Sequence, residues 1–268
     1  MSRLSRRLSA YKEQGRKALI SFITAGDPHA SATVPALHAL VKGGVDVLEL
    51  GMPFSDPEAD GPAIQRASER ALANKIRLAD VLRMVREFRE DDAETPVLLM
   101  GYLNPIMRMG FEPFVDAAAS AGVDALIIVN LPPEEADDLR AILSRHDIDL
   151  VFLIAPTTTP ERAQLIGRAS SGFVYYVSLK GVTGADLVES DALAQRVESL
   201  RACTDLPILV GFGIKDAASA KRTAAIADGV VVGTVLVNTM ASMANDLSGI
   251  PDALTEQVRE LRDAIDPS

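Results

Sequence analysis

Cysteine and basic residues are scarce in this chain, and both shortages narrow what it can do. Among its 268 residues Cys203 is the single cysteine, so no disulfide framework can form, and a reducing cytoplasm is the expected compartment. Acidic residues outnumber basic ones by 37 to 27, which gives a formal net charge of −10. A surface of that sign disfavours binding to nucleic acid or to an anionic membrane.

Long apolar runs are also missing. The basic amino-terminal segment is followed only by the short run Leu19–Thr24 before Gly26 and Pro28 interrupt it. That run is shorter than the apolar core of a signal peptide and far shorter than a membrane span. We therefore expect a soluble protein.

Histidine is rare, and no catalytic motif that depends on it is present. His29, His38 and His146 lie in a predicted loop or in predicted helices, so none ends a strand. With one cysteine and no histidine–carboxylate cluster, the sequence predicts no metal site. It also lacks the G-x-S-x-G elbow of serine hydrolases and a G-x-G-x-x-G fingerprint after a strand.

What the chain does contain is a regular alternation of eight short apolar runs with amphipathic stretches. The runs suit buried strands, and the stretches have apolar residues near helical spacing. The predicted strands are Ala18–Thr24, Val45–Leu50, Val97–Met100, Ala125–Asn130, Leu150–Ala155, Phe173–Ser178, Ile208–Gly211 and Gly229–Val232. The predicted helices include Val34–Lys42, Leu78–Arg89, Pro113–Ala121, Pro133–Arg145, Pro160–Ala169, Asp191–Arg201 and Ala217–Ile226.

This alternation predicts an α/β protein, a (β/α)8 TIM barrel formed as a single domain over residues 1–268. The joint Gly44-Val45-Asp46 before the second strand is repeated as Gly122-Val123-Asp124 before the fourth, as an array of βα units would produce. An open doubly wound sheet is the alternative, but such sheets usually have fewer strands.

Segments outside the eight units are expected to complete the barrel. Met1–Tyr11 precedes the first strand and is predicted to cap the closed end, and Pro251–Ile265 is predicted to be an extra carboxy-terminal helix. Two strand-to-helix loops, Gly51–Pro62 and Leu179–Asp191, are longer than simple connections. Because the active sites of barrels are built from such loops, we expect the functional site there.

The clearest candidate for chemistry is a lone carboxylate in the second predicted strand. Glu49 has the same parity as Val45 and Val47, so it is expected to face the barrel interior. A buried carboxylate is costly unless it is used or well paired. Asp60 lies in the loop that follows and can fold back over the strand end. We interpret the two as an acid–base pair; the alternatives are a paired structural acid and an ordinary Asp-Gly-Pro turn.

Glycines gather where the last three predicted strands end. Because basic side chains are few there, backbone N–H groups are the expected ligands of a phosphate, and glycine allows their close approach. Isolated turns are the alternative explanation. The residues concerned are Gly181, Gly184, Gly211, Gly213, Gly233 and the adjacent Thr234.

A substrate that spans the barrel mouth would carry its phosphate at one end and its reacting group at the other. The lining between the two ends is predicted to be apolar and to suit a flat ring. It consists of Phe22, Ile64, Met100, Ile127, Leu153 and Phe212. Two further readings remain: a Schiff-base aldolase that uses Lys180, and a binding subunit without catalytic activity.

Several segments resemble one known family over nearly the whole chain, the tryptophan synthase alpha chain. They are SFITAGDP, LELGMPFSDPEADGP, GYLNPI, LPPEE, IAPTTTPER, YYVSLKGVTGA and VGFGI. The resemblance implies a (β/α)8 barrel that cleaves indole-3-glycerol phosphate to indole and glyceraldehyde 3-phosphate. It also implies no metal or cofactor in this chain, and a pyridoxal-phosphate beta subunit, joined in an alpha2-beta2 assembly, that receives the indole through a tunnel.

The resemblance also assigns roles to residues. It makes Glu49 the acid–base residue and Asp60 the partner of the indole N–H, with Tyr175 and Thr183 in support. Phe22, Met100, Ile127 and Phe212 would hold the ring, and Gly184, Gly213, Gly233 and Thr234 would bind phosphate. Pro53, Asp56 and Pro57 would face the beta subunit.

Three residues depart from the family pattern. Glu58 stands where an apolar residue is usual, Asn130 where aspartate is common and Thr234 where serine is frequent. None of them touches the proposed acid–base pair. We further expect that Glu49, in its apolar strand, titrates at an unusually high pH while Asp60 stays ionised.

Overall fold

The computed structural model describes residues 1–177, 186–211 and 213–266, and its centre is one parallel nine-stranded sheet. The sheet order is β5-β4-β3-β2-β1-β9-β8-β7-β6. The strands are β1 (Ala18–Thr24), β2 (Val47–Gly51), β3 (Val97–Gly101), β4 (Ala125–Ile128), β5 (Asp149–Val151), β6 (Leu153–Ile154), β7 (Val174–Val177), β8 (Ile208–Gly211) and β9 (Gly229–Val232).

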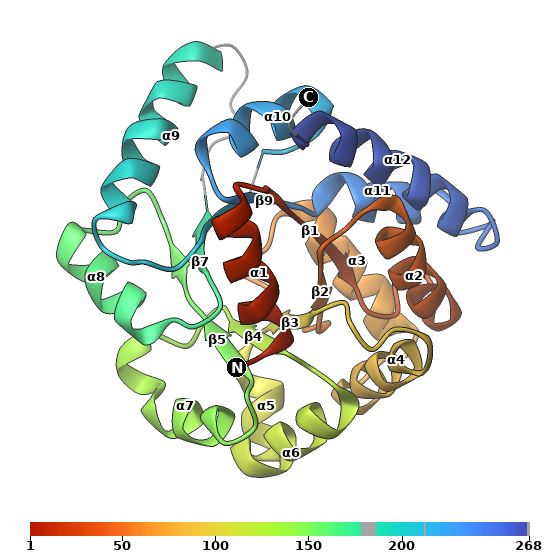
Figure 1. The fold of residues 1–268 in the computed structure, drawn as a ribbon. Helices are drawn as coiled ribbons and strands as arrows, with labels where there is room; N and C mark the ends of the chain where they lie inside the picture. The colour runs from red at the N-terminus through yellow and green to blue at the C-terminus, as the bar shows by residue number, and fades with distance from the viewer. Residues whose placement is uncertain (178–185, 212, 267–268) are drawn as a thin grey trace.

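The sheet closes into the predicted (β/α)8 barrel. Its two ends, β5 and β6, are consecutive in the chain and are separated only by Phe152, so together they occupy one of the eight strand positions. Figure 1 shows the strands at the centre and the helices around them. The prediction of one strand over Leu150–Ala155 was therefore wrong in detail.

Helices pack against the barrel, the first at its amino-terminal end and the later ones around its outer side. They are α1 (Arg3–Gln14), α2 (Thr33–Gly43), α3 (Pro62–Ala73), α4 (Leu78–Asp91), α5 (Leu103–Met109), α6 (Phe111–Ala121), α7 (Asp137–Ser144), α8 (Pro160–Ala169), α9 (Asp186–Arg201), α10 (Ala217–Ile226), α11 (Thr234–Ser242) and α12 (Ile250–Ile265), with 3-10 turns η1 (Ala30–Ala32) and η2 (Pro133–Glu135). Among the described residues, no helix is both long and apolar enough to span a membrane.

Three predicted segments differ from the structure. Pro133–Arg145 is not one helix: it divides at Ala136 into η2 and α7. The helix predicted from Asp191 already begins at Asp186, within the segment predicted to be a loop. Val45 was predicted to face the barrel interior, but it precedes β2 and packs in the layer between sheet and helices.

Helix α1 closes the amino-terminal end of the barrel, as predicted. Leu4 and Leu8 are buried and pack with the interior side chains of the strands, among them Val47 and Phe173. In Figure 1 α1 lies across the middle of the barrel. Arg3 of this helix pairs with the buried Asp124 at 2.8 Å.

The repeated Gly-Val-Asp joint has a structural explanation. Gly44 takes the left-handed conformation (φ 110°) that ends α2 and turns the chain into β2. The Asp46 carboxylate that follows accepts the backbone N–H of Leu19 at 2.8 Å and pairs with Arg262 of α12 at 2.8 Å. Asp124 likewise accepts the N–H of Val97 at 2.8 Å. These aspartates therefore join neighbouring strands at the closed end of the barrel.

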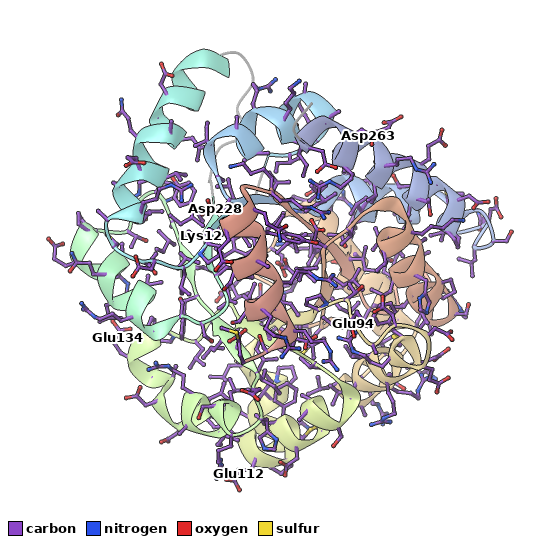
Figure 2. All side chains as sticks on the ribbon, viewed as in Figure 1. Lys12, Glu94, Glu112, Glu134, Asp228 and Asp263 are labelled. Atoms are coloured by element: carbon purple, nitrogen blue, oxygen red, sulfur yellow. The ribbon has the colours of Figure 1, made fainter. Side chains whose placement is uncertain are left out.

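Many of the charged side chains away from these joints lie on the outside of the helices. Glu112 and Glu134 are at the periphery in Figure 2, and each pairs with an arginine, Arg145 at 2.7 Å and Arg162 at 2.6 Å. Both pairs are solvent-exposed, so each contributes little stability. The closed end is thus held by buried ion pairs, which leaves the opposite, carboxyl end of the strands for a site.

Candidate active site

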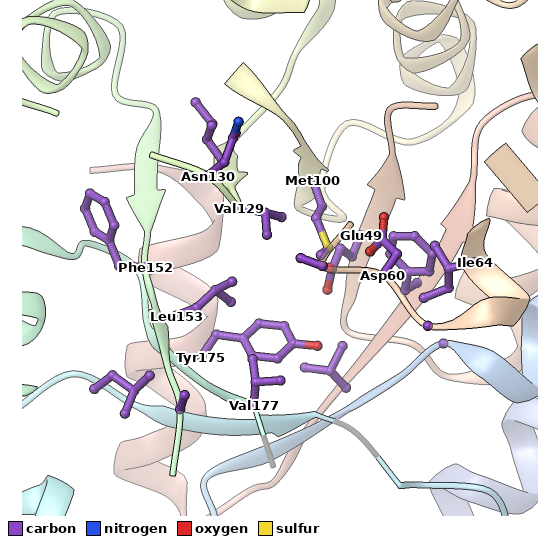
Figure 3. Close-up of a pocket in the computed structure, with 18 of the residues that line it drawn as sticks. Glu49, Asp60, Ile64, Met100, Val129, Asn130, Phe152, Leu153, Tyr175 and Val177 are labelled. Carbon is purple, nitrogen blue, oxygen red and sulfur yellow. The ribbon is translucent and has the colours of Figure 1, made fainter. Parts of the chain in front are cut away.

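A cavity of about 760 Å³ opens at the carboxyl ends of the strands. Glu49 of β2 and Asp60 of the loop after it both line this cavity. Figure 3 shows their side chains on the same side of the cavity, with Tyr175 and Leu153 across from them. The structure therefore brings the predicted acid–base pair together at the place where barrel enzymes carry out their chemistry.

Glu49 is deeply buried at the floor of the described cavity. Its side chain is 1% exposed, and neither carboxylate oxygen has a hydrogen-bond partner among the described residues. Burial, and secondarily the charge of Asp60, raises the pKa of Glu49 to about 8. Because a buried carboxylate without hydrogen bonds favours its neutral form, Glu49 carries a proton at neutral pH and can serve as an acid.

Asp60 differs from Glu49 because it has a hydrogen-bond donor. Tyr102 Oη donates to Asp60 Oδ2 at 3.2 Å. Burial raises the pKa of Asp60 to about 6, and the hydrogen bond from Tyr102 lowers it. The ionised form is therefore the major one at pH 7, although the shift is larger than the sequence suggested. The pair has the split acidity that an acid and an anion need.

Tyr102 was missed by the sequence reasoning. It directly follows β3, accepts the backbone N–H of Ala59 at 3.0 Å and stacks on Phe54 with ring centroids 5.0 Å apart. The sequence did offer a signal for Tyr102, because a residue directly after a predicted strand lies at the end of the barrel where the site is built. These contacts fix the loop that carries Asp60.

Tyr175 of β7 faces the interior, as expected, and lines the cavity. Burial, followed by the charges of Glu49 and Asp60, raises its pKa well above the ordinary value, so the phenol stays neutral. A Cβ at position 211 would clash with the Tyr175 hydroxyl. Gly211 is therefore needed for the tyrosine to reach its place.

The predicted apolar lining is largely in position. Phe22, Ile64, Met100 and Leu153 line the cavity, joined by Val129 and Val177, which were not predicted. Ile127 is fully buried in the interior cluster beneath, and its neighbour Ile128 lines the cavity instead. Phe212 lies outside the described residues.

The predicted phosphate end lies where β8 and β9 finish. Gly213, Gly233 and Thr234 line the cavity there. Helix α11 begins at Thr234, and no side chain among the described residues caps it. Its first backbone N–H groups therefore supply partial positive charge at the cavity wall. Lys180, Gly181, Thr183 and Gly184 lie outside the described residues.

The loop that carries Asp60 also carries the residues predicted to face a partner. Asp56 is exposed and accepts a hydrogen bond from Ser55, while Pro53 and Pro57 are partly exposed. Asn130 contacts the start of α5: its Oδ1 accepts the backbone N–H of Leu103 at 2.8 Å. No metal-binding cluster of histidine, cysteine, aspartate and glutamate occurs within the described ranges.

The chain is a (β/α)8 barrel with two carboxyl groups of different acidity at its mouth, which is the arrangement of a barrel enzyme. A family model described as tryptophan synthase alpha chain matches residues 8–266. The chain belongs to the tryptophan synthase alpha chain family, whose members are lyase subunits.

Curated relatives cover the full length. The tryptophan synthase alpha chain of Thioalkalivibrio sulfidiphilus is 55% identical over 266 residues, 99% of this chain and 100% of that one. The alpha chain of Marinobacter nauticus is 53% identical, covering 99% and 98%.

Solved structures agree. Tryptophan synthase subunit alpha from Legionella pneumophila is 44% identical with a TM-score of 0.92, covering 99% of each chain. A chain of tryptophan synthase from M. tuberculosis in an open form is 35% identical with a TM-score of 0.87, also covering 99% of each.

Proposed function

We propose that this chain cleaves indole-3-glycerol phosphate to indole and glyceraldehyde 3-phosphate by general acid–base catalysis. The observation that carries the proposal is Glu49, a carboxyl group that is 1% exposed and has no hydrogen-bond partner among the described residues, in a cavity shared with Asp60. A carboxyl group placed in this way lowers the stability of the fold, and groups of this kind are concentrated at functional sites. A role in tryptophan biosynthesis follows from the family.

The reaction divides between the two carboxyl groups. Protonated Glu49 donates its proton to C3 of the indole ring, and the positive charge that develops on the ring nitrogen is stabilised by ionised Asp60 at the N–H. The electron pair of the bond between C3 and the carbinol carbon then returns to the ring, which releases indole. The carbinol hydroxyl gives its proton to the Glu49 carboxylate as the aldehyde forms, so the catalyst is regenerated.

The remaining walls position the substrate in this scheme. Phe22, Ile64, Met100 and Leu153 offer apolar contacts to the ring. Backbone N–H groups at Gly213, Gly233 and Thr234, at the start of α11, would bind the phosphate, with the helix dipole favouring the anion. Tyr175 stays neutral beside Glu49, and Ile127 supports the floor from below.

We further propose that the chain works in a complex with a tryptophan synthase beta subunit, two alpha and two beta chains, to which the indole passes. The exposed Pro53, Asp56 and Pro57 segment at the cavity rim is the surface that we assign to the partner. Pyridoxal phosphate would belong to the beta subunit, and the cleavage itself calls for no cofactor or metal. The continuous sheet supports a single domain over residues 1–268, and a cytoplasmic location suits the biosynthetic role.

The proposal is tested by measuring indole and triose phosphate after incubation of the purified chain with indole-3-glycerol phosphate, alone and with a beta subunit. We expect the wild type to form both products in equal amounts, and to form them faster when the beta subunit is present. Asp60→Asn should form them much more slowly than the wild type. A covalent adduct trapped by borohydride at Lys180 would instead establish a Schiff-base aldolase, and the absence of products in every mixture would end the proposal.

A further inference from the structure

The cavity extends well beyond the carboxyl pair. Past Val129 and Leu153 it continues into a side chamber between the ends of β4 and β6 and the start of α8. We call this chamber the outer lobe and define it by Asn130, Pro133, Phe152, Ala155, Thr158 and Ile166. In Figure 3 Asn130 and Phe152 lie on the far side from Glu49, Asp60 and Ile64. Small-ligand sites begin at about 300 Å³, so a cavity of about 760 Å³ has room to spare.

The wall of the outer lobe offers mainly apolar surface. Phe152 and Ile166 are 5% and 3% exposed, and Pro133 is buried. The polar groups nearby are already engaged: Thr158 Oγ1 accepts the N–H of Ala155 at 3.1 Å. The Asn130 side chain is likewise committed to α5. An apolar group that entered the lobe would therefore gain contacts without stripping hydrogen bonds from the wall.

An exposed ion pair lies beside the lobe. Arg162 at the start of α8, which lines the cavity, pairs with Glu134 of η2 at 2.6 Å. The pair joins η2 to α8, and these elements contribute Pro133 and Ile166 to the lobe. The other lining residues lie in the short connections after β4, β5 and β6.

The orientation of the substrate follows from the other two walls. Under the proposed function, Asp60 near β2 holds the ring N–H, and the phosphate lies at β8 and β9 beside Gly233. The ring nitrogen and C3 belong to the five-membered ring, so the six-membered ring must point to the remaining wall, between β4 and β6. Carbons 5 and 6 of the indole then face the outer lobe.

We propose that the outer lobe is a specificity subsite that accepts small apolar substituents, such as halogen or methyl, on the six-membered ring of the substrate. The inference rests on the proposed function, because that function sets the orientation of the ring. It widens the substrate class from indole-3-glycerol phosphate to its ring-substituted derivatives.

Ala155 is the residue to alter, because a larger side chain there fills the lobe and no catalytic role falls to it. We expect kcat/KM for the 5-chloro substrate to stay within about tenfold of the parent in the wild type. In Ala155→Trp, kcat/KM for the 5-chloro substrate should fall by a further factor of about ten, which is the scale of discrimination by a blocked apolar pocket. In the same variant, kcat/KM for the parent substrate should change less than about twofold. Ala155→Leu should give an intermediate loss, which keeps the test valid if the tryptophan variant does not fold.

Ala244→Trp is the matched control, since Ala244 is exposed and lies in the connection between α11 and α12. It should leave both substrates unaffected. The inference would be overturned if the wild type cleaved the parent substrate but rejected the chloro substrate. It would also be overturned if Ala155→Trp and Ala155→Leu lost activity equally toward both substrates.

Binding separates this inference from the proposed reaction. The chain contains no tryptophan, so the fluorescence of indole or 5-chloroindole reports its own binding to the wild type and to Ala155→Leu. Selective loss of 5-chloroindole binding in the variant would support the lobe even if no cleavage occurred. Cleavage of the parent with unchanged 5-chloroindole binding in the variant would refute the lobe and leave the reaction intact.

Discussion

At the scale of single residues, the site depends on an unfavourable placement. Glu49 pairs in register with Phe22 of β1 and Leu98 of β3, so its neighbours across the sheet are apolar. Asp60 accepts a hydrogen bond from Tyr102, whereas Glu49 accepts none from the part of the chain that the structure describes. One carboxyl group is therefore neutral and the other ionised at the same pH, which is what a proton donor and an anion acting on one substrate require.

The pH dependence of the reaction follows from this difference. Catalysis needs Asp60 ionised and Glu49 protonated, with pKa values of about 6 and about 8. We expect kcat/KM to rise with pH through about 6, to level off, and to fall above about 8. Initial rates at low substrate concentration between pH 5 and 9.5 measure this. A rate that keeps climbing above pH 8 would show that Glu49 is not the acid.

Stability should show the cost of Glu49. Its pKa rises from an ordinary 4.5 to about 8 on folding, so the folded state binds more protons between these values and the wild type loses stability as pH rises through them. Glu49→Gln lacks this loss and should be more stable by on the order of a few kcal/mol above pH 8, with little gain near pH 4.5. Urea unfolding at both pH values tests the difference; an equal effect at the two would refute it.

Tyr102 should act through Asp60. Its hydrogen bond lowers the pKa of Asp60, so Tyr102→Phe should raise that pKa and move the acidic limb of the kcat/KM profile to higher pH. The rate at pH 6 should then fall more than the rate at pH 7.5. Tyr11→Phe is the control, because Tyr11 donates to Asp46 at the opposite end of the barrel. A uniform loss across pH would mean that Tyr102 only supports the loop.

At the scale of elements, the two ends of the barrel have separate tasks. Helix α1 fills the amino-terminal end with Leu4 and Leu8, while the carboxyl end stays open over Glu49 and Asp60. The strand joints at Asp46 and Asp124 stabilise the closed end without approaching the cavity. Stability and catalysis can therefore be changed independently.

Truncation within α1 tests this separation. Leu8 is 2% exposed, and Leu8→Ala should lower the free energy of unfolding by about 2–5 kcal/mol. Activity at a temperature where the variant remains folded should stay within about twofold of the wild type. Ser9→Ala, on the exposed side of the same helix, should change stability by no more than about 0.5 kcal/mol. A large change in KM for Leu8→Ala would mean that the two ends are coupled.

Elements with a strong local pattern could be predicted from sequence, and elements without one could not. Ala18–Thr24 and Gly229–Val232 were predicted to the residue because apolar runs end there at polar or turn residues. Helices α5 and α11 were missed because they are short and begin one or two residues after a strand, at Leu103 and Thr234, with no loop to announce them. The break at Phe152 is a tertiary effect within an apolar run.

At the scale of the whole molecule, topology explains why the carboxyl pair was predictable and its surroundings less so. Strand parity places Glu49 in the interior, and the barrel fold places its strand end at the mouth. Parity does not give height along the barrel, so Ile127 was expected in the cavity but lies below it. The Tyr102–Asp60 contact joins residues 42 apart, and the outer lobe needs β4, β6 and α8 together.

The role of Glu49 as proton donor is tested by comparing Glu49→Gln with the wild type at saturating indole-3-glycerol phosphate, pH 7. Glutamine keeps the size of the side chain but cannot supply the proton. We expect that substrate still binds, while the rate of indole formation falls by about 10²–10⁴-fold. A variant that releases indole at nearly the wild-type rate would contradict the account.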